Sequence, residues 1–453
     1  MIVMKFGGTS VKDADAFRNV TEIIKSRLQK NPLIVVSALA GITNLLVELF
    51  KAAADQNTEL INSSILEIKQ RHYKLIDELF GDGKQTELLN LIDSEVDKLT
   101  TLINAAKTIK VRGGAISHAV MSVGEILSSN ILNEYLISHR IKSGYLDSRS
   151  VMVIENNGYE PVPNTESIKV KAEKIILPLM KNNQCVVCAG FIGLTEEEEP
   201  ATLGRNGSDY TASLLCSALN GDELEIWSDV DGILTADPSI IPTARPLKVM
   251  SFNEACELAY FGARVLHPAT IQPVLEKNIP VKVLNTKTPA SEGTLIIKEI
   301  NNYESAEVVK SIAYKEGITL LNMESSKLLL SPKITEDVLS ILSYHGKRVY
   351  AISKSATKLS VTIENHSDDL VTLLKEISAF GEVAAEKNKV IVSVVGEKMR
   401  GHSSIHWRIL QTLDEANINV SLVSQFSSQI SLMFIIDEVD IERTVKLLHE
   451  KFI

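Results

Sequence analysis

The first run with chemical potential is Lys5-Phe6-Gly7-Gly8-Thr9-Ser10. Residues 1–4 predict a short buried strand, and the spacing of apolar residues over 11–28 predicts an amphipathic helix. Two glycines let backbone N–H groups come close to a ligand, and the following helix N-terminus, with Thr9 or Ser10 as its expected cap, favours anions. Lys5 adds a positive charge. The run predicts a phosphate-binding turn, although an ordinary strand-to-helix turn with an incidental lysine explains these six residues equally well.

A second polar run leads into a helix predicted over 210–219. It reads Thr202-Leu203-Gly204-Arg205-Asn206-Gly207-Ser208-Asp209, with an arginine between glycines and an expected capping pair in Ser208 and Asp209. Such a helix start can receive an anion. The run therefore predicts a second anion-binding turn.

Carboxylates gather after a strand predicted over 223–227. Ser228, Asp229 and Asp231 follow it directly, and the loop continues to Asp237 and Pro238. Carboxylates in this place suit a metal ion or a ribose. Glu125, inside a helix predicted over 116–136, is ambiguous by itself because a helical glutamate is usually solvated.

The elements that position these residues alternate between strand and helix. Buried strands are predicted over 32–36, 184–190, 223–227 and 281–284, and a charged helical insertion over 58–110. This alternation predicts a mostly parallel sheet with helices on both faces. Ligands then gather at the carboxyl ends of the strands.

The composition shifts after residue 294, and residues 300–305 predict a linker. Beyond it, residues 349–361 align without a gap on 420–432 when the chain is slid by 71 positions. Each copy predicts helix, two strands and helix, with a further strand ahead of it at 317–322 or 390–395. The pattern alone leaves two readings, an inert dimerisation module and a small-molecule sensor.

Composition narrows the class of partner. The chain has 453 residues, 45% of them hydrophobic, and 47 basic against 57 acidic residues give a formal charge of −10. We therefore expect a globular, cytoplasmic protein that binds small molecules, without a nucleic-acid surface, a secretory signal or a membrane span. Cys185 and Cys188 lie on a predicted strand, where residues three apart face opposite ways, so we expect four reduced thiols and no metal shared by this pair.

Taken together, these stretches resemble the aspartate kinases, specifically the monofunctional lysine-sensitive type. The resemblance covers nearly the whole chain and rests on six motifs in the same order. They are Lys5 to Ser10, Ser37 to Asn44, Gly124-Glu125, Leu203 to Tyr210, Ser228 to Pro238, and Phe261 to Ala269.

The resemblance implies an α/β protein with an amino-acid-kinase fold, an αβα sandwich around a mostly parallel sheet, over residues 1–294. A linker at 295–308 and two βαββαβ ACT domains over 309–453 then follow. The first ACT domain, near 324–386, is expected to be inserted between 309–323 and 387–453. Association through the ACT domains into a homodimer or homotetramer is the expected assembly.

The implied activity is transfer of the γ-phosphoryl group of MgATP to the side-chain carboxylate of L-aspartate, which gives 4-phospho-L-aspartate for lysine, threonine and methionine biosynthesis. The acceptor carboxylate is ionised near pH 7, so no general base is needed. By resemblance, Lys5 stabilises the transferring group, Asp209 organises Lys5 or the magnesium, Arg205 clamps a substrate carboxylate, and Glu125 meets the substrate ammonium. The full implied set is catalytic Lys5 and Asp209; substrate-binding Thr43, Glu125, Arg205 and Ser208; and nucleotide-binding Lys5, Gly7, Gly8, Ser228, Asp229, Leu234, Arg264 and Val265, with ATP and Mg²⁺ as cofactors and the metal ligands unassigned.

The sequence departs from the family pattern at the implied nucleotide site and at the implied effector site. Relatives often have tyrosine, arginine and lysine where this chain has Leu234, Ser239 and Arg264, so contacts to the base are expected to differ. The effector residues implied by resemblance are Ser331, Ile334 and Val349. The runs 331–334 and 348–350 lack the small or acidic residues that would hold a lysine ammonium, so lysine feedback is a hypothesis.

Two other functions compete with this prediction. A kinase for glutamate or acetylglutamate shares much of the pattern, but the paired ACT units and the combination of Glu125 with Arg205 favour aspartate. A catalytically silent amino-acid sensor is disfavoured because Lys5, Arg205 and Asp209 are all present. A fused homoserine dehydrogenase is not expected, since the sequence has no GxGxxG and stops after the second ACT unit.

Overall fold

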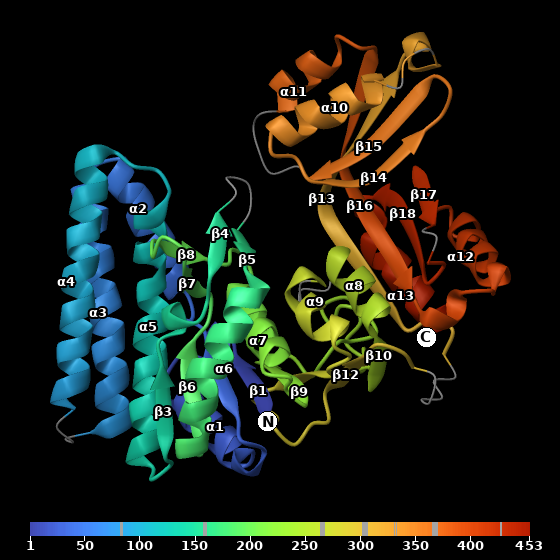
Figure 1. Ribbon diagram of the computed structural model, residues 1–453. Coiled ribbons are helices and arrows are strands. Elements are labelled where there is room, and N and C mark those ends of the chain that lie inside the picture. The colour runs from blue at the N-terminus through green and yellow to red at the C-terminus, as the bar shows by residue number, and fades with distance from the viewer. Residues whose placement is uncertain are drawn as a thin grey trace. The chain divides into compact units, whose positions relative to one another are not determined.

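The computed structural model of the chain is shown in Figure 1. It describes residues 1–81, 85–156, 161–262, 268–300, 307–329, 331, 333–364, 370–425 and 428–453. Contacts divide the chain into two compact units. The first comprises Met1–Ile233, Pro246–Phe252 and Val265–Asn301, and the second comprises Leu234–Arg245, Asn253–Arg264 and Asn302–Ile453.

An eight-stranded sheet organises the first unit. Its strands are β1 (Ile2–Phe6), β2 (Leu33–Val36), β3 (Ser143–Leu146), β6 (Cys185–Ala189), β9 (Glu223–Ser228), β10 (Val249–Ser251), β11 (Val281–Asn285) and β12 (Thr294–Ile297). They lie in the order β10-β12-β11-β9-β1-β2-β6-β3, and only the β11–β12 pair is antiparallel. The expected mostly parallel sheet is confirmed. Strand β12 occupies the first residues of the predicted linker at 295–308.

Helices cover both faces of this sheet (Figure 1). The core that includes Ile2, Met4 and Phe6 also contains apolar residues of α1 (Ala14–Lys25), α2 (Ile42–Ala54) and α5 (Ala115–Ser138). Side chains alternate along a strand, so Lys5 projects to the other face. On that face, α6 (Thr165–Asn182) and α7 (Gly207–Ala218) contact the strands, and α9 (Pro268–Glu276) packs on α7.

The predicted helical insertion is confirmed as a hairpin of two long helices. They are α3 (Thr58–Phe80) and α4 (Thr86–Ile109), which pack against α2 and α5 and share their apolar core. Two small hairpins complete the first unit, β4 (Ile154–Asn156) with β5 (Pro161–Pro163), and β7 (Ile192–Leu194) with β8 (Pro200–Thr202).

A six-stranded antiparallel sheet organises the second unit. Its strands are β13 (Ser311–Glu324), β14 (Val349–Lys354), β15 (Lys358–Glu364), β16 (Glu382–Val395), β17 (Leu422–Gln425) and β18 (Ser431–Asp437), in the order β14-β15-β13-β16-β18-β17. The helices are α8 (Phe252–Tyr260), α10 (Lys333–Tyr344), α11 (Leu370–Ile377), α12 (Ser403–Glu415) and α13 (Ile441–Phe452).

The sheet of the second unit is built from two similar halves. Residues of α10, α11 and β15 form one apolar core, while residues of α12, α13 and β18 form another. The long strands β13 and β16 pair with each other and run through both halves. The end of β13 also pairs with β15 in one half, and the end of β16 also pairs with β18 in the other. The repeated pair of strands predicted at 349–361 and 420–432 corresponds to β14–β15 and β17–β18. The predicted domain boundaries themselves stay a prediction.

Two predicted helix caps are wrong. A 3₁₀ turn at Gly8–Val11 follows the first glycines, so α1 starts only at Ala14 and is capped by Asp13, whose carboxylate accepts the Ala16 N–H at 2.9 Å. The N-cap of α7 is Asn206, in a left-handed conformation that asparagine tolerates, and Ser208 and Asp209 fall within the first turn. The phosphate-binding turn predicted at Lys5–Ser10 therefore does not abut an α-helix N-terminus.

Other expectations concern cysteines, metals and membranes. All four cysteines are free thiols, and burial raises the pKa of Cys188 to about 12. Among the described residues there is no cluster of three or more His, Cys, Asp or Glu able to hold a metal. No helix in the described part of the chain has the length and apolar character needed to cross a bilayer.

Candidate active site

The candidate site lies where the central parallel strands end. The Gly7 N–H donates to the Trp227 carbonyl at 3.3 Å, the Ser37 N–H to Phe6 at 3.1 Å, and the Gly190 N–H to Val36 at 2.8 Å. These bonds join the residues that follow β1, β2 and β6 to the neighbouring strand ends. Parallel strands end at a common edge, and ligands of open α/β sheets bind there.

Lys5 and Asp209 form an ion pair at this edge. Lys5 Nζ lies 2.6 Å from Asp209 Oδ1, and their side chains are 13% and 8% exposed. Asp209 is in the first turn of α7, where the helix dipole stabilises a carboxylate. The start of α7 is tied to the sheet, because the Phe191 N–H donates to Thr211 Oγ1 at 2.9 Å. A nearly buried ammonium is thus fixed next to Gly7, on which a Cβ would lie 3.6 Å from Lys5 Nζ.

Gly8 is required by a close approach of two loops. A Cβ on Gly8 would lie 3.0 Å from the carbonyl oxygen of Ala38, a distance that backbone atoms could not relieve without shifting. The turn after β1 therefore packs directly on the loop after β2. Both loops belong to motifs on which the family resemblance rests.

Glu125 is buried beneath the loop that follows β2. Glu125 is 2% exposed, and this burial raises the pKa of its carboxyl to about 8. The backbone N–H of Ala38 donates to the carboxyl and lowers the pKa, but by less than burial raises it. Its Oε2 has no hydrogen-bond partner among the described residues. A cation that binds next to this buried carboxyl would stabilise its ionised form.

Arg205 and Thr43 differ in their surroundings. Arg205 is exposed in the loop before α7, and its guanidinium forms no ion pair with any residue that the structure describes. Thr43 is half-buried in the first turn of α2, and Ser208 is buried in the first turn of α7. The substrate-binding roles of these residues stay predictions.

The strand end at β9 carries the predicted nucleotide-binding residues Ser228 and Asp229. The Ser228 carbonyl accepts both the N–H and the hydroxyl of Thr286, at 2.8 and 2.9 Å. Asp231 accepts from Asn285 at 2.8 Å and Thr288 at 2.7 Å, and these two bonds lower the pKa of its carboxyl. Residues 285–288 were not among the predicted site residues. They are polar residues directly after the buried strand β11, the same signal that marked Ser228.

The structure does not test the remaining predicted nucleotide-binding residues. Leu234 belongs to the second unit, where its carbonyl accepts the Ser311 hydroxyl at 2.8 Å. Arg264 and Val265 lie outside the described residues. Their roles stay predictions.

The predicted effector residues all lie in the second unit. The side chain of Ile334 is buried in the core of α10 and α11. Val349 begins β14, and its carbonyl accepts the Tyr260 hydroxyl at 3.2 Å. The Ser331 N–H donates to Lys327 at 3.0 Å. These contacts leave the effector assignment a prediction.

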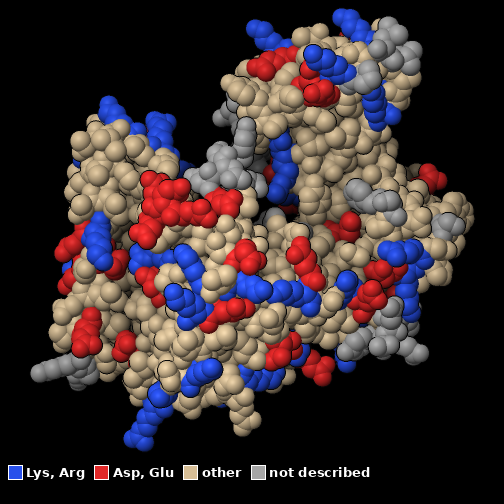
Figure 2. Space-filling view, viewed as in Figure 1, with Lys and Arg blue, Asp and Glu red and all other residues tan. Residues whose placement is uncertain are grey.

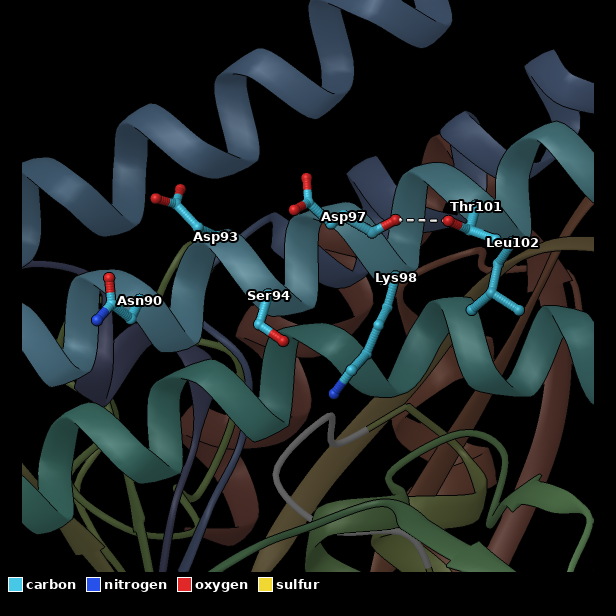
Figure 3. A pocket seen from close by; sticks show the side chains of 7 residues that line it. All are labelled: Asn90, Asp93, Ser94, Asp97, Lys98, Thr101 and Leu102. Carbon is cyan, nitrogen blue, oxygen red and sulfur yellow. Dashed lines mark hydrogen bonds between the residues drawn. The ribbon is translucent and has the colours of Figure 1, made fainter.

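Surface features elsewhere do not coincide with the candidate site. Figure 3 shows a pocket along α4, where the Thr101 hydroxyl donates to the Asp97 carbonyl; it is lined by Asn90, Asp93, Ser94, Asp97, Lys98, Thr101 and Leu102. Asp93 also accepts the hydroxyl of Tyr73 on α3. None of these lining residues was predicted as a site residue. Figure 2 shows basic and acidic side chains interspersed on the face in view.

Comparison with known proteins gives the family. Residues 1–285 match the Amino acid kinase family, and residues 392–452 match an ACT domain. Lysine-sensitive aspartokinase 3 of Escherichia coli (strain K12) is 32% identical over 99% of this chain and 98% of its own length. The chain belongs to the aspartokinases. Aspartokinase 1, chloroplastic, of Arabidopsis thaliana is 31% identical over 99% of this chain and 80% of that protein.

Solved aspartokinase structures share the whole fold. Escherichia coli aspartokinase III in complex with aspartate and ADP has a TM-score of 0.85 at 30% identity, covering 99% of each chain. The same enzyme in complex with lysine and aspartate also scores 0.85 at 30% identity, covering 100% of this chain and 99% of that chain. The predicted fold, the aspartate kinase activity and regulation through ACT domains are confirmed for this aspartokinase.

Proposed function

We propose that this chain uses ATP and Mg²⁺ to phosphorylate the side-chain carboxylate of L-aspartate at the edge formed by β1, β2, β6 and β9. The supporting observation is the Lys5–Asp209 pair, which holds an ammonium 2.6 Å from a carboxylate and next to Gly7. A cation fixed in this way is available to the phosphate oxygens without reorganisation. Preorganised charge of this kind is the main contribution that a protein makes to phosphoryl transfer.

Aspartate recognition needs a cation for its α-carboxylate and an anion for its ammonium. Arg205, exposed and without an ion-pair partner among the described residues, is proposed to bind the α-carboxylate through its planar fork. Glu125, with the unpartnered Oε2, is proposed to accept the ammonium. Thr43 and Ser208 add hydrogen bonds from the first turns of α2 and α7.

The donor groups at this edge suit a magnesium–nucleotide complex. Mg²⁺ usually binds one or two carboxylates together with substrate phosphates and water, and Asp209 is a carboxylate at this edge. When bound, the ion neutralises charge on the nucleotide phosphates. Ser228 and Asp229 are proposed to line the nucleotide site, with Leu234, Arg264 and Val265 as further predicted members.

The reaction is a displacement at phosphorus. A side-chain carboxylate oxygen of aspartate forms a bond to the γ-phosphorus, and the bond from that phosphorus to the β,γ-bridging oxygen breaks, which leaves ADP. No proton has to be removed, because the attacking carboxylate is already ionised. Lys5 is proposed to stabilise the negative charge on the transferring group while Arg205 and Glu125 hold the acceptor in line.

The test traps the acyl phosphate. The full-length protein is incubated with MgATP, hydroxylamine and either aspartate or glutamate, and the hydroxamate is measured. We expect hydroxamate with aspartate only. Product with glutamate alone would replace the substrate assignment, and no product with either would favour a silent sensor.

Effector binding is the finer part of the proposal. A solved relative contains lysine, and this chain has the matching ACT region. We propose an amino-acid effector in the ACT unit, with lysine as the first candidate, and assembly into a homodimer or homotetramer. Lysine, threonine or both are added to the hydroxamate assay, and sedimentation gives the assembly; an unchanged rate with each addition removes the effector claim.

A further inference from the structure

The loop between β2 and α2 is a tight turn with one position that favours glycine. Gly41 has φ +82°, a value that L side chains rarely adopt, and it is the N-cap of α2. The Ile42 N–H donates to Leu39 at 2.9 Å and the Leu45 N–H donates to Gly41 at 3.0 Å. The orientation of the Ala40–Gly41 peptide therefore decides where α2 starts and where Thr43, one residue inside it, is placed.

An arginine of the helical hairpin contacts this peptide directly. Arg71, on α3, donates from Nη2 to the Ala40 carbonyl at 2.6 Å, across 31 residues of sequence. A Cβ built on Gly41 would lie 3.6 Å from Arg71 Nη1, so the guanidinium rests against the turn. The ion pair that Arg71 forms with a described residue is to Glu67 on the same helix, and it is long, at 3.9 Å. The bond to Ala40 is thus its dominant polar interaction.

The same loop is held on its other side by α5. The Ser128 hydroxyl donates to the Ser37 carbonyl at 2.8 Å, and the Ala38 N–H donates to the Glu125 carboxylate. The helix α5 therefore holds the Ser37–Ala38 peptide of this loop, and α3 holds the Ala40–Gly41 peptide. The contact from α5 includes Glu125, the residue proposed to meet the substrate ammonium.

We propose that Arg71 is a positioning residue for aspartate, which acts by fixing the Ala40 carbonyl and thereby the loop that carries Thr43. This inference rests on the proposed function and assigns to the helical hairpin a part in substrate binding. A charged donor to a carbonyl is stronger than a neutral one, and a loop that is ordered before binding loses less conformational entropy when the ligand arrives. Arg71 itself need not touch the substrate.

The matched pair of variants is Arg71→Met and Lys74→Met. Both remove a cation from α3, but the Lys74 side chain is 76% exposed and pairs only with Glu78 at 3.7 Å among the described residues. For R71M we expect the KM for aspartate to rise roughly 5- to 20-fold, with kcat and the KM for ATP within about twofold of wild type. K74M should match wild type, and Arg71→Lys, which restores a charged donor, should recover part of the loss.

A second measurement follows the loop without catalysis. Hydrogen exchange of the amides at 41–45 should be faster in R71M than in wild type, and unchanged in K74M. The inference is overturned if R71M keeps both the wild-type KM for aspartate and the wild-type exchange. It is also overturned if kcat and thermal stability fall while that KM stays the same, because Arg71 would then serve stability alone. Failure of wild type to phosphorylate aspartate would instead reject the proposed function, and the exchange comparison would still test the loop contact.

Discussion

Each unit contains a lysine–carboxylate ion pair with little exposure, and we expect the two pairs to have different roles, one in ligand binding and one in stability. Lys5 Nζ lies 2.6 Å from Asp209 in the first unit, and Lys310 Nζ lies 2.9 Å from Glu254 in the second. The first pair has side chains that are 13% and 8% exposed, whereas the second pair is 4% and 0% exposed. Their lengths are similar, so their surroundings must account for any difference in role.

The pair in the second unit is enclosed by backbone. Glu254, on α8, also accepts the Glu397 N–H at 2.6 Å, and the Lys310 N–H donates to the Val395 carbonyl at 2.8 Å, next to the start of β13. The Lys5 pair instead lies at a sheet edge, next to Gly7. An enclosed pair fixes how α8 packs on the sheet, while a pair at an edge keeps its ammonium within reach of a ligand.

The largest expected effect is on stability, from Lys310→Met. Removing the lysine takes the ammonium away from a carboxylate whose side chain is 0% exposed, so the free energy of unfolding should fall by about 3–5 kcal/mol. Urea unfolding followed by circular dichroism measures it. Lys248→Met is the control, since that lysine pairs with Glu292 at 3.9 Å and both side chains are over 80% exposed. An unchanged midpoint for K310M would mean that the enclosed pair is not structural.

The next effect is on catalysis, from Lys5→Met. Loss of a preorganised cation should raise the barrier by roughly 3 kcal/mol, which is on the order of a 100-fold fall in kcat in the hydroxamate assay. Its unfolding midpoint should move less than that of K310M. Lys12→Met, at a 55% exposed position after the 3₁₀ turn that follows β1, serves as the control. If K5M lost stability and kept its kcat, the contrast between the two pairs would be wrong.

The sequence predicted the fold largely because apolar periodicity is a local signal. Strand β1 and the hairpin of α3 and α4 followed from their patterns, and the repeat of 71 residues anticipated two similar halves in the second sheet. The caps failed for a local reason as well. The pattern does not distinguish a 3₁₀ turn at 8–11 from the first turn of a helix, so Asp13 was not identified as the cap of α1.

Contacts between residues far apart in the chain could not be predicted from the sequence alone. Lys5 and Asp209 are 204 positions apart, and only the side of the sheet on which each residue falls brings them together. The bond from Arg71 to Ala40 had no signal, because a helical arginine is usually solvated. Thr286 was within reach of pattern reasoning, since it follows a buried strand in the same way as Ser228.

A smaller effect is expected from Arg205→Lys, which tests whether the edge around Lys5 is a substrate site. A lysine keeps the charge and loses the planar fork, so the KM for aspartate should rise about 10-fold or somewhat more, while the KM for ATP stays close to wild type. Arg112→Lys, whose side chain is 82% exposed, is the matched control. Equal changes in both KM values would place Arg205 outside the aspartate site.

The smallest expected effect is on the pH dependence of stability, through the protonation of Glu125. The pKa of its carboxyl is about 8 in the folded chain and 4.5 as the ordinary value. Between pH 4.5 and pH 8, therefore, Glu125 is protonated in the folded state and ionised in the unfolded state. The stability from protonated Glu125 is complete below pH 4.5 and is lost as the pH rises through 8, so Glu125→Gln should flatten the fall of the unfolding midpoint with pH.

Aspartate binding should reverse that protonation. An ammonium beside Glu125 favours the ionised carboxylate, so binding at pH 7 should release up to about one proton, and calorimetry in two buffers of different ionisation enthalpy measures the release. E125Q should release none, whereas Glu95→Gln, at a buried glutamate paired with Lys98 on α4, should behave as wild type. Equal release by wild type and E125Q would show that the ammonium lies elsewhere, and the edge around Lys5 would then hold phosphate without the aspartate site proposed beside it.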